Sequence, residues 1–418
     1  MRIVRSLAPS LAVALLGVAA LAACSSAAPK PVGVSTSNGC AWPWTVGAQS
    51  YNVSMPDSNA VDWFQPIVAS RATSITVSGT YPDARYFSLS VYTPYGTPVS
   101  ADGVSSSLSD YRIAPDHGSV NPWQHRAASG GRYRVMVRSG VAPGETNALP
   151  FPPGTTSVHP GYLHLRVYLP SGGNFDRIKL PTITVTNGSM SHTLPSCRTH
   201  AQVQPAEKAP SGTPRSSPPT TPPPDTFFKS LVSSGFDNVD AGYVGAYVIR
   251  PAPTEVLLVT AKAPTFPAGS HPSPWPAPGV DIQYWSMCIG AGTSRLPTVV
   301  NKLPDGQVDY GCRADEQTKV NAAGHYTYVI GSEAQRAAIS RVAGATFLPF
   351  ADNQTTPLYL LWLRNELVNP DFAHSASAVA TADDGAAAAA AMGPYYPRVY
   401  TCALATLTTK GITACEAS

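Results

Sequence analysis

Four aspartates are spaced as two catalytic pairs would be. Asp110 precedes a tyrosine and is followed six residues later by Asp116, and Asp309 and Asp315 repeat this arrangement further along the chain. Two carboxyl groups roughly 5 to 9.5 Å apart can act as general acid and base on a glycosidic bond. An aspartate before a tyrosine also caps turns, and two copies of a domain would both keep such a role. We favour the structural role and keep an envelope-directed hydrolase as the alternative.

Two arginines lie on the last strand that the two halves are expected to share. Arg166 and Arg364 could each clamp a carboxylate or phosphate with two parallel hydrogen bonds. An arginine in a strand more often pairs with an aspartate of its own chain. We favour internal pairing and retain both residues as binding candidates.

Tryptophans supply the second set of binding candidates. Trp123 and Trp275 each lie beside prolines, which predicts that they are on loops. An aromatic ring on a loop can stack on a sugar ring. Both residues are therefore candidates for contact with envelope glycan.

Motifs for metal or nucleophile chemistry are missing from the sequence. There is no H-E-x-x-H, no C-x2-C pair and no G-x-S-x-G elbow. We predict neither a metal site nor a cofactor, and an enzyme is less expected than a binding protein.

The candidate residues belong to a duplicated segment. Most of the matched positions are about 197 to 200 residues apart, which predicts two copies of one domain, and this reading matches Asp110 with Asp309 and Asp116 with Asp315. The matched segments are Tyr86-Phe87-Ser88-Leu89 with Tyr284-Trp285-Ser286-Met287, Gly131-Arg132-Tyr133 with Gly324-His325-Tyr326, and Leu149-Pro150-Phe151 with Leu348-Pro349-Phe350.

Apolar and polar residues largely alternate within both copies, as in half-buried antiparallel strands. Clear examples are 75–78, 87–92, 133–138 and 163–168, answered by 256–259, 284–289, 326–330 and 359–363. With 42 prolines and 33 glycines separating such runs, we predict an all-β fold of two duplicated β-sandwich or jelly-roll-like domains. Residues 332–342 predict a short helix in the second copy, and the alanine run 386–391 fits either a capped helix or a loop.

The strand pattern resembles a family of bacterial β-sandwich domains of unknown function. The resemblance rests on Tyr86-Phe87-Ser88-Leu89, on Asp110-Tyr111-Arg112-Ile113 and on the late strand 162–170, and more faintly on residues 359–364. The chain departs from the family where Leu149-Pro150-Phe151 and Leu348-Pro349-Phe350 replace a tryptophan-led segment. The resemblance implies a fold and no catalytic residues.

The first residues predict export. Arg2 and Arg5 precede the apolar run 11–20, as in a secretory signal. The segment ends in Leu21-Ala22-Ala23-Cys24, which resembles a bacterial lipobox. The resemblance implies cleavage before Cys24 and a lipid on its thiol, so that the protein would be anchored in a membrane at the extracytoplasmic face of the cell envelope.

The remaining cysteines are even in number, which favours disulfides in an exported chain. Sequence alone leaves all connectivities open, but position suggests Cys40 with Cys197, Cys288 with Cys312 and Cys402 with Cys415. The long first closure would contribute about 5 kcal/mol and each short one about 3 kcal/mol.

The expected organisation is a signal peptide at 1–23, a tether at 24–39, a first β-sandwich domain at 40–197, a Pro/Ser/Thr-rich linker at 198–225 and a second domain at 226–418. A net charge of +3 over 418 residues gives no basic face for nucleic acid. We therefore expect a binding or scaffolding module whose partner is an envelope glycan or an envelope protein. The alternatives are the hydrolase and a site for a small hydrophobic ligand between the two domains.

Overall fold

The computed structural model describes residues 39–70, 72–99, 103–126, 130–197, 204–205, 224–230, 235–293, 295–352 and 357–416. The predicted signal peptide, Cys24 and most of the predicted tether and linker lie outside these residues, so the predicted domain boundaries remain predictions. We refer to 39–197 with 204–205 as the first lobe and to 224–416 as the second lobe. No helix among the described residues is long and apolar enough to cross a membrane.

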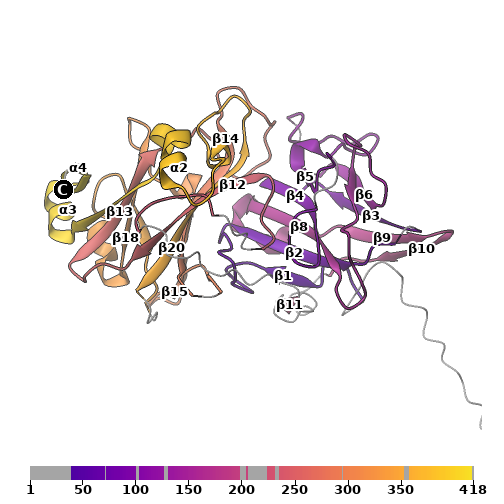
Figure 1. The fold of residues 1–418 in the computed structure, drawn as a ribbon, viewed down its shortest axis with the longest axis horizontal. Coiled ribbons are helices and arrows are strands. Elements are labelled where there is room, and N and C mark those ends of the chain that lie inside the picture. The colour runs from indigo at the N-terminus through magenta and orange to yellow at the C-terminus, as the bar shows by residue number, and fades with distance from the viewer. Residues whose placement is uncertain are drawn as a thin grey trace, which may run out of the picture. The chain divides into compact units, whose positions relative to one another are not determined.

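The first lobe is a β-sandwich of two sheets (Figure 1). One sheet has the order β11-β1-β2-β8-β4-β5. Its strands are β1 (Trp44–Val46), β2 (Ala60–Ile67), β4 (Ala84–Tyr92), β5 (Ser107–Ser109), β8 (Gly161–Pro170) and β11 (Gln204–Pro205). The other has the order β10-β9-β3-β6-β7. Its strands are β3 (Thr73–Thr80), β6 (Arg132–Arg138), β7 (Ala148–Pro150), β9 (Thr182–Asn187) and β10 (Met190–Leu194).

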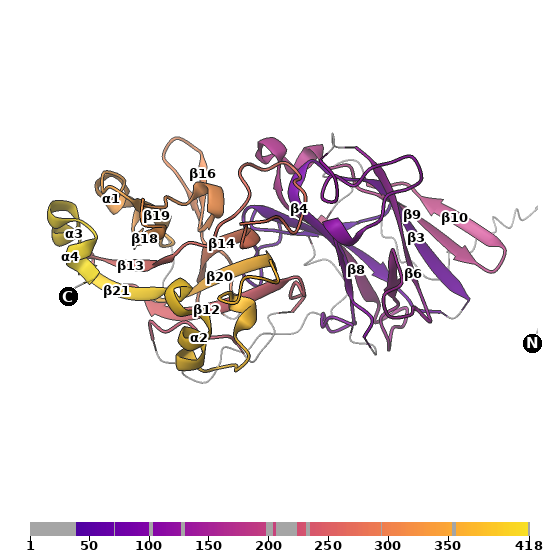
Figure 2. The same cartoon turned by 90° about the horizontal axis from the view of Figure 1, so that it is seen from above.

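The second lobe contains two main sheets and one small one (Figure 2). The order β12-β20-β14-β17 joins β12 (Ala241–Ile249), β14 (Ile282–Ala291), β17 (Cys312–Ala314) and β20 (Leu358–Val368). The order β19-β18-β13-β21 joins β13 (Glu255–Lys262), β18 (His325–Gly331), β19 (Ala345–Pro349) and β21 (Arg398–Ala403). The small sheet pairs β15 (Val300–Lys302) with β16 (Val308–Tyr310).

Strand topology confirms the duplication. β2-β8-β4-β5 and β12-β20-β14-β17 are the same antiparallel arrangement. In the other sheet of each lobe, the central strand pairs antiparallel with two neighbours, and one of these neighbours carries a short parallel strand. The predicted all-β, two-sandwich fold is therefore confirmed.

Helices are short and gather in the second lobe. The α-helices are α1 (Arg336–Ile339), α2 (Gly385–Met392), α3 (Leu404–Lys410) and α4 (Thr413–Glu416), and the 3-10 turns are η1 (Asp110–Arg112), η2 (Ser171–Gly173), η3 (Phe175–Arg177), η5 (Asp315–Gln317), η6 (Glu333–Gln335), η7 (Ala376–Ala378) and η8 (Gly393–Tyr395). The alanine run is a helix, because the side chain of Asp384 accepts a hydrogen bond from the Ala387 amide at 2.9 Å and Gly393 ends it.

Alternating side chains build each core. In β3 and β6, Ile75, Val77, Val135 and Val137 point into the first sandwich and are fully buried, whereas their polar neighbours face outward. β4, β8 and β14 are buried along their whole length. These strands are covered on both sides, so polar residues of β4 and β14 lie inside the protein. Their polar atoms must therefore form hydrogen bonds within the chain.

The three predicted disulfides are confirmed. Cys40 is bonded to Cys197, Cys288 to Cys312 and Cys402 to Cys415. The first closes the first lobe over a separation of 157 residues. The other two span 24 and 13 residues within the second lobe.

Candidate functional site

The candidate aspartates Asp110 and Asp315 occupy equivalent places in the two lobes. Each comes directly after the edge strand, β5 or β17, and begins a 3-10 turn. The carboxylate of Asp110 accepts hydrogen bonds from its neighbouring Tyr111 amide at 2.6 Å and from the Phe87 amide at 3.4 Å. The carboxylate of Asp315 accepts the same pair from the amides of Glu316, at 2.7 Å, and Trp285, at 3.2 Å.

The match of Asp110 with Asp309 was therefore wrong. In the paired strands Ser88 is opposite Ser109 and Ser286 is opposite Ala314, so that the next residue is Asp110 in one lobe and Asp315 in the other. The small sheet of β15 and β16 lies before β17 in the second lobe and adds residues that the first lobe lacks at that point. Because of this insertion, Asp309-Tyr310 stands at the spacing of the repeat without being equivalent to Asp110-Tyr111.

Arg85 and Gln283 connect these two aspartates across the lobes. Arg85 donates through Nη1 to Asp315 Oδ2 at 3.3 Å and to the Gln283 carbonyl at 3.1 Å. Gln283 donates through Nε2 to Asp110 Oδ2 and to the Arg85 carbonyl, both at 3.0 Å. Each residue immediately precedes the tyrosine that begins the repeated segment, so the contact is reciprocal.

Burial has the largest effect on the pKa values of Asp110 and Asp315. Their side chains and those of Arg85 and Gln283 are fully buried. Burial raises the pKa of Asp110 well above its ordinary value, against hydrogen bonds from the Tyr111 amide and Gln283 that lower it. Burial also raises the pKa of Asp315 to about 7, although the guanidinium of Arg85 acts in the opposite direction. A raised carboxyl pKa suits a general acid, but neither group is exposed to a substrate, so both act as links between the lobes.

A second reciprocal network lies around Tyr86 and Tyr284. Asp57 of the first lobe accepts from the hydroxyl of Tyr284 at 2.7 Å and from Ser286 Oγ at 2.6 Å. Asp240 of the second lobe accepts from the hydroxyl of Tyr86 at 3.0 Å, and Asn238 donates to the same hydroxyl at 3.1 Å. Each lobe thus supplies a polar residue that forms a hydrogen bond with the hydroxyl of a buried tyrosine in the other lobe.

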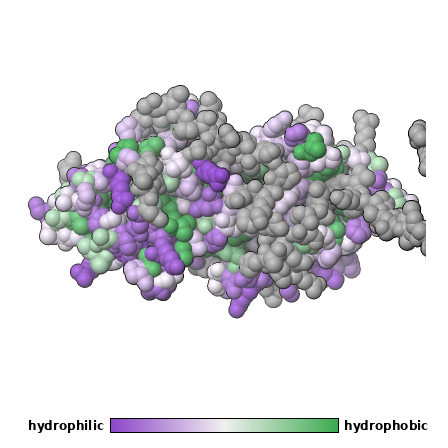
Figure 3. Space-filling view, turned by 90° about the horizontal axis from the view of Figure 1, so that it is seen from below, coloured by the Kyte–Doolittle hydropathy of each residue, from purple (hydrophilic) through white to green (hydrophobic). Residues whose placement is uncertain are grey.

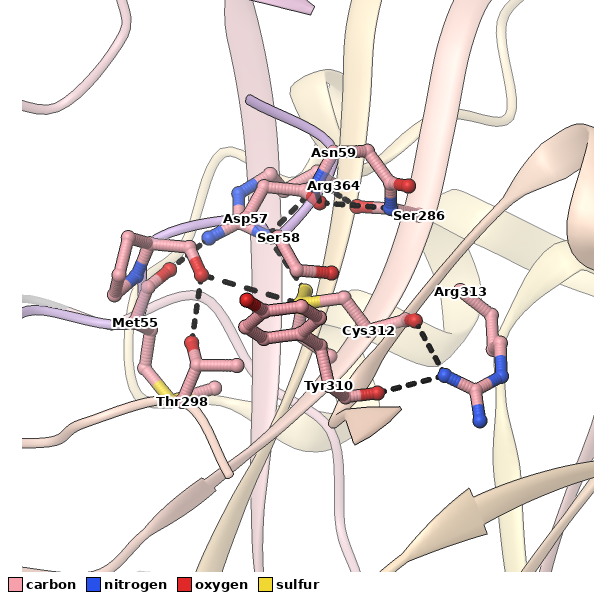
Figure 4. Close-up of a disulfide and its surroundings, with 12 residues drawn as sticks. Met55, Asp57, Ser58, Asn59, Ser286, Thr298, Tyr310, Cys312, Arg313 and Arg364 are labelled. Carbon is pink, nitrogen blue, oxygen red and sulfur yellow. Dashed lines mark hydrogen bonds and ion pairs between the residues drawn. A yellow bond between two sulfur atoms is a disulfide. The ribbon is translucent and has the colours of Figure 1, made fainter. Parts of the chain in front are cut away.

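The candidate arginines Arg166 and Arg364 pair internally, as we favoured. Arg166 forms an ion pair with Asp62 at 2.8 Å, and Arg364 forms one with Asp57 at 3.3 Å. Figure 4 shows Asp57 between Arg364 and Ser286. Both guanidinium groups are almost fully buried and have protein partners, which leaves them engaged within the chain.

The same arginines fix two exchanged arms. We call residues 52–57 the first arm and residues 235–238 the second arm. Arg364 of the second lobe donates to the Met55 carbonyl of the first arm, and Arg166 of the first lobe donates to the Phe236 carbonyl of the second arm at 2.8 Å. Each arm precedes the first shared strand of its own lobe, β2 or β12, and binds to the other lobe.

The tip of each arm is apolar. Met55 is buried beside the Cys288–Cys312 disulfide and Leu296, and its amide donates to the Leu296 carbonyl at 2.8 Å. Phe236 stacks on His164 with ring centroids 4.9 Å apart. Its amide donates to the Gly96 carbonyl at 2.7 Å. The arms therefore combine backbone hydrogen bonds with buried apolar contact.

Two buried polar side chains near these arms have atoms without a hydrogen-bond partner among the described residues. These atoms are both ring nitrogens of His164 and Oε2 of Glu366. Burial lowers the pKa of His164 well below its ordinary value and raises the pKa of Glu366 well above its own. His164 is therefore neutral, and burial also favours the neutral form of Glu366.

The remaining candidate aspartates, Asp116 and Asp309, form ion pairs of their own at partly exposed positions. Asp116 pairs with Arg134 at 3.0 Å, and Asp309 pairs with Arg313 at 2.9 Å and also with Arg336. These contacts leave Asp116 outside the buried network that contains Asp110, and Asp309 outside the one that contains Asp315. The structure does not bring either predicted pair together as a shared site.

The proposed exposure of Trp123 and Trp275 was wrong. Both lie outside strands, but their exposed fractions are 0% and 6%. Trp123 Nε1 donates to the Arg85 carbonyl at 2.9 Å, and the Trp275 amide donates to the Trp123 carbonyl at 2.8 Å. The ring of Trp123 packs on Tyr81 and Phe87 in the first-lobe core, whereas Trp275 is buried among residues of both lobes, so neither ring is available to stack on a sugar.

Sequence reasoning missed Arg85, Gln283, Asp57 and Asn238. Arg85 and Gln283 are 198 residues apart, directly before the matched tyrosines, so extending the repeat by one position would have found them. Asp57 and Asn238 left no such signal, because the segments around them differ in sequence.

One group of described residues has the proximity of metal ligands. Asp57, Cys288 and Cys312 place ligand atoms within 4.8 Å of one another. The two sulfurs are bonded to each other in a disulfide, so they offer no thiolates. The arrangement does not fit a metal ion.

Comparison with known proteins adds evidence about the fold. No family model matches the chain, and no curated protein matches it. A crystal structure of an uncharacterised Burkholderia cenocepacia protein matches with 11% identity and a TM-score of 0.50, over 89% of this chain and 85% of that one. A Vibrio parahaemolyticus protein matches with 11% identity and a TM-score of 0.38, over 84% of this chain and 91% of that one. The chain thus shares the fold of the Burkholderia cenocepacia protein.

Proposed function

We propose that the protein is a lipid-anchored, extracytoplasmic module that binds glycan of the cell envelope through its first lobe. The lipobox resemblance at Leu21-Ala22-Ala23-Cys24 supports the anchor, and the three disulfides support an oxidising compartment. Cys24 would carry the lipid, and the tether would place the two lobes beside the membrane.

The reciprocal contact between Arg85, Gln283, Asp110 and Asp315 is the observation that carries this proposal. Asp110 and Asp315, one carboxyl group from each candidate pair, accept hydrogen bonds from the chain itself and are fully buried. A binding protein needs no such groups, and it gains from lobes that are fixed to each other. We therefore favour binding over hydrolysis.

The region between the lobes is filled, which weakens the alternative of a hydrophobic ligand there. Tyr86, Tyr168 and Leu169 of the first lobe pack in one buried cluster with Tyr284 and Leu367 of the second. The rings of Tyr168 and Tyr284 are 5.0 Å apart between centroids.

The outward face of β3 and β9 offers a polar surface instead. Ser74, Thr76 and Ser78 of β3 are paired with Thr186, Thr184 and Thr182 of β9. These hydroxyl residues lie opposite the buried face of the sheet and are partly exposed. A regular array of hydroxyls on a firm sheet can exchange hydrogen bonds with sugar hydroxyls.

Exposed apolar residues are dispersed over both lobes. Tyr95, Met190, Ile249 and Val308 come from four separate segments. On the face drawn in Figure 3, hydrophobic residues form several separate green areas among hydrophilic and intermediate ones. Single apolar residues of this kind are normal on a protein surface and favour a polar ligand over a lipid.

Retention of the purified, oxidised ectodomain, residues 25–418, on isolated envelope glycan and lipid fractions tests the proposal. We expect saturable retention on glycan without release of sugar or fatty acid. Thr184→Glu, in the middle of the polar face, should reduce retention, while Thr254→Glu, on an exposed loop of the second lobe, should not. Released product, or equal retention of both variants, would contradict binding through this face.

A further inference from the structure

A hollow lies at the end of the polar face of the first lobe. It has a volume of about 620 Å³, and residues from β3, β6 and the segment before β9 line it, among them Ser78, Thr80, Arg132, Arg134 and Lys179. A smaller hollow of about 220 Å³ shares Thr80 and Lys179 with it and adds Arg177. Because the two hollows share Thr80 and Lys179, we treat them together as the basic groove, which we define by these six residues.

The cations of the groove are mostly free to bind a ligand. Arg132, Arg177 and Lys179 are exposed, and their side chains form no hydrogen bond or ion pair with the described part of the chain. Arg134 is 64% exposed at its side chain and pairs with Asp116 at 3.0 Å. The groove thus presents three cations without a side-chain partner and one paired with Asp116, and the carboxylate of Asp83 also lines its smaller part.

This concentration of charge stands out in a weakly charged protein. The groove holds four of the 28 lysines and arginines in a chain of 418 residues. Like charges in proximity repel one another, so such a cluster favours folding less than dispersed charges would. An anionic ligand would remove that repulsion.

The fold itself does not require these cations. Arg132 is opposite Thr80 at the end of the β3–β6 pair, and His325 takes the equivalent place opposite Lys262 in the second lobe. Two residues further, Arg134 corresponds to Thr327. The second lobe has the same strands without these arginines, so the positive groove belongs to the first lobe alone.

We propose that the basic groove binds the anionic groups of a negatively charged glycan. Arg132 and Arg177 bind its carboxylate or phosphate groups with two parallel hydrogen bonds each, and the ammonium group of Lys179 adds a compact positive charge. The hydroxyls of Ser78 in the groove and of Thr182, which also lines the larger hollow, bind the neutral part of the sugar. This inference rests on the proposed function and adds the charge of the ligand to it.

Calorimetric titration of the oxidised ectodomain with three probes tests the groove. The probes are hexagalacturonate, the same hexamer with its carboxyl groups methyl-esterified, and an oligomer of glycerol phosphate. The variants are Arg132→Gln with Lys179→Gln, and the matched control Lys302→Gln with Lys410→Gln. The control removes the same two charges from exposed positions of the second lobe.

We expect one of the two anionic probes to bind at least about ten times more tightly than the esterified hexamer, with an affinity that falls as salt is added. The groove variant should lose about ten-fold or more of that affinity, and the control variant should lose little. Preference for hexagalacturonate assigns carboxylate as the ligand group, and preference for the glycerol phosphate oligomer assigns phosphate.

Other outcomes separate the two proposals. Equal binding of esterified and charged hexamers would overturn the basic groove and leave glycan binding in place. Equal losses in both variants would show attraction by net charge only and would overturn the groove. Binding of the charged probes at the groove, combined with no retention on envelope glycan, would overturn the proposed function and leave an anion site.

Discussion

Arg85 and Gln283 are the same position of the repeat, and each donates a hydrogen bond to the backbone carbonyl of the other. From this shared point, Arg85 also reaches Asp315 in the second lobe and Gln283 reaches Asp110 in the first. The contact therefore has the symmetry of an isologous interface within a single chain.

Removing Arg85 should destabilise the protein more at pH 8 than at pH 5. Arg85→Met leaves Asp315 buried without its cation, and breaking a buried pair in this way typically costs about 3 to 5 kcal/mol when the carboxylate is charged. At pH 5 Asp315 is mostly protonated because burial raises its pKa to about 7, so the loss should be smaller. Denaturant unfolding at both pH values measures the difference. Arg134→Met, which removes the exposed partner of Asp116, should change stability by about 1 kcal/mol or less at either pH.

Asp315 should make stability fall as pH rises from about 4 to about 7. Its folded-state pKa of about 7 lies above the ordinary aspartate value of about 3.9, so the folded protein binds more protons than the unfolded chain in this window. Asp315→Asn should reduce that slope by up to about 1.4 kcal/mol per pH unit and leave it unchanged above pH 7. Stability curves of the wild type and the variant, measured every half unit, compare the slopes. An unchanged slope in Asp315→Asn would contradict the buried titration, and Asp116→Asn is the control at a partly exposed site.

The exchanged arms should stabilise the protein through their apolar tips. Met55→Ala removes a side chain that is 2% exposed and should cost about 2 to 5 kcal/mol. Met190→Ala, at a residue that is 70% exposed, should have almost no effect. Thermal or denaturant unfolding of the two variants checks this, and equal small effects would show that the first arm contributes little.

Removal of a disulfide should cost more stability when the loop that it closes is longer. Replacing Cys40 and Cys197 by alanine should cost about 5 kcal/mol in the chain-entropy treatment, because their bond spans 157 residues. Replacing Cys402 and Cys415, which are 13 residues apart, should cost about 3 kcal/mol. Unfolding of each double variant under oxidising conditions gives the comparison, and a larger loss for the short loop would contradict the entropic account.

The lipid anchor depends on one thiol. Cys24→Ser should leave the exported protein in the aqueous phase of a detergent partition, whereas the wild type should enter the detergent phase. Labelling with a fatty-acid analogue gives a second measurement on the same samples. Label that persists in Cys24→Ser would exclude this residue as the lipidated one.

The sequence was sufficient for the fold because each signal was local and repeated. Alternation along 75–78 and 133–138 predicted half-buried strands, and matching runs in the second copy predicted the same sheet again. The six cysteines could be paired because they flanked recognisable units. These features depend on residue type and spacing, which a sequence displays directly.

The candidate site was harder to predict because its contacts lie between the copies. Trp123 and Trp275 have the proline neighbours of exposed loop residues, but Trp123 packs in the core of the first lobe and Trp275 is buried among residues of both lobes. Asp309 has the spacing of a repeated residue, but the β15–β16 insertion places it there. Arg85 could have been found from the repeat, whereas its partner Asp315 required the strand register.

The exchanged arms also affect how far the sequences of the two lobes can diverge. In a homodimer with this interface, any substitution would occur twice and would alter both surfaces at once. Covalent fusion of the two copies lets Met55 and Phe236 differ while each still fills the opposite lobe. The same freedom allows one copy to carry the basic groove and the other to carry helices, without loss of the contacts that unite them.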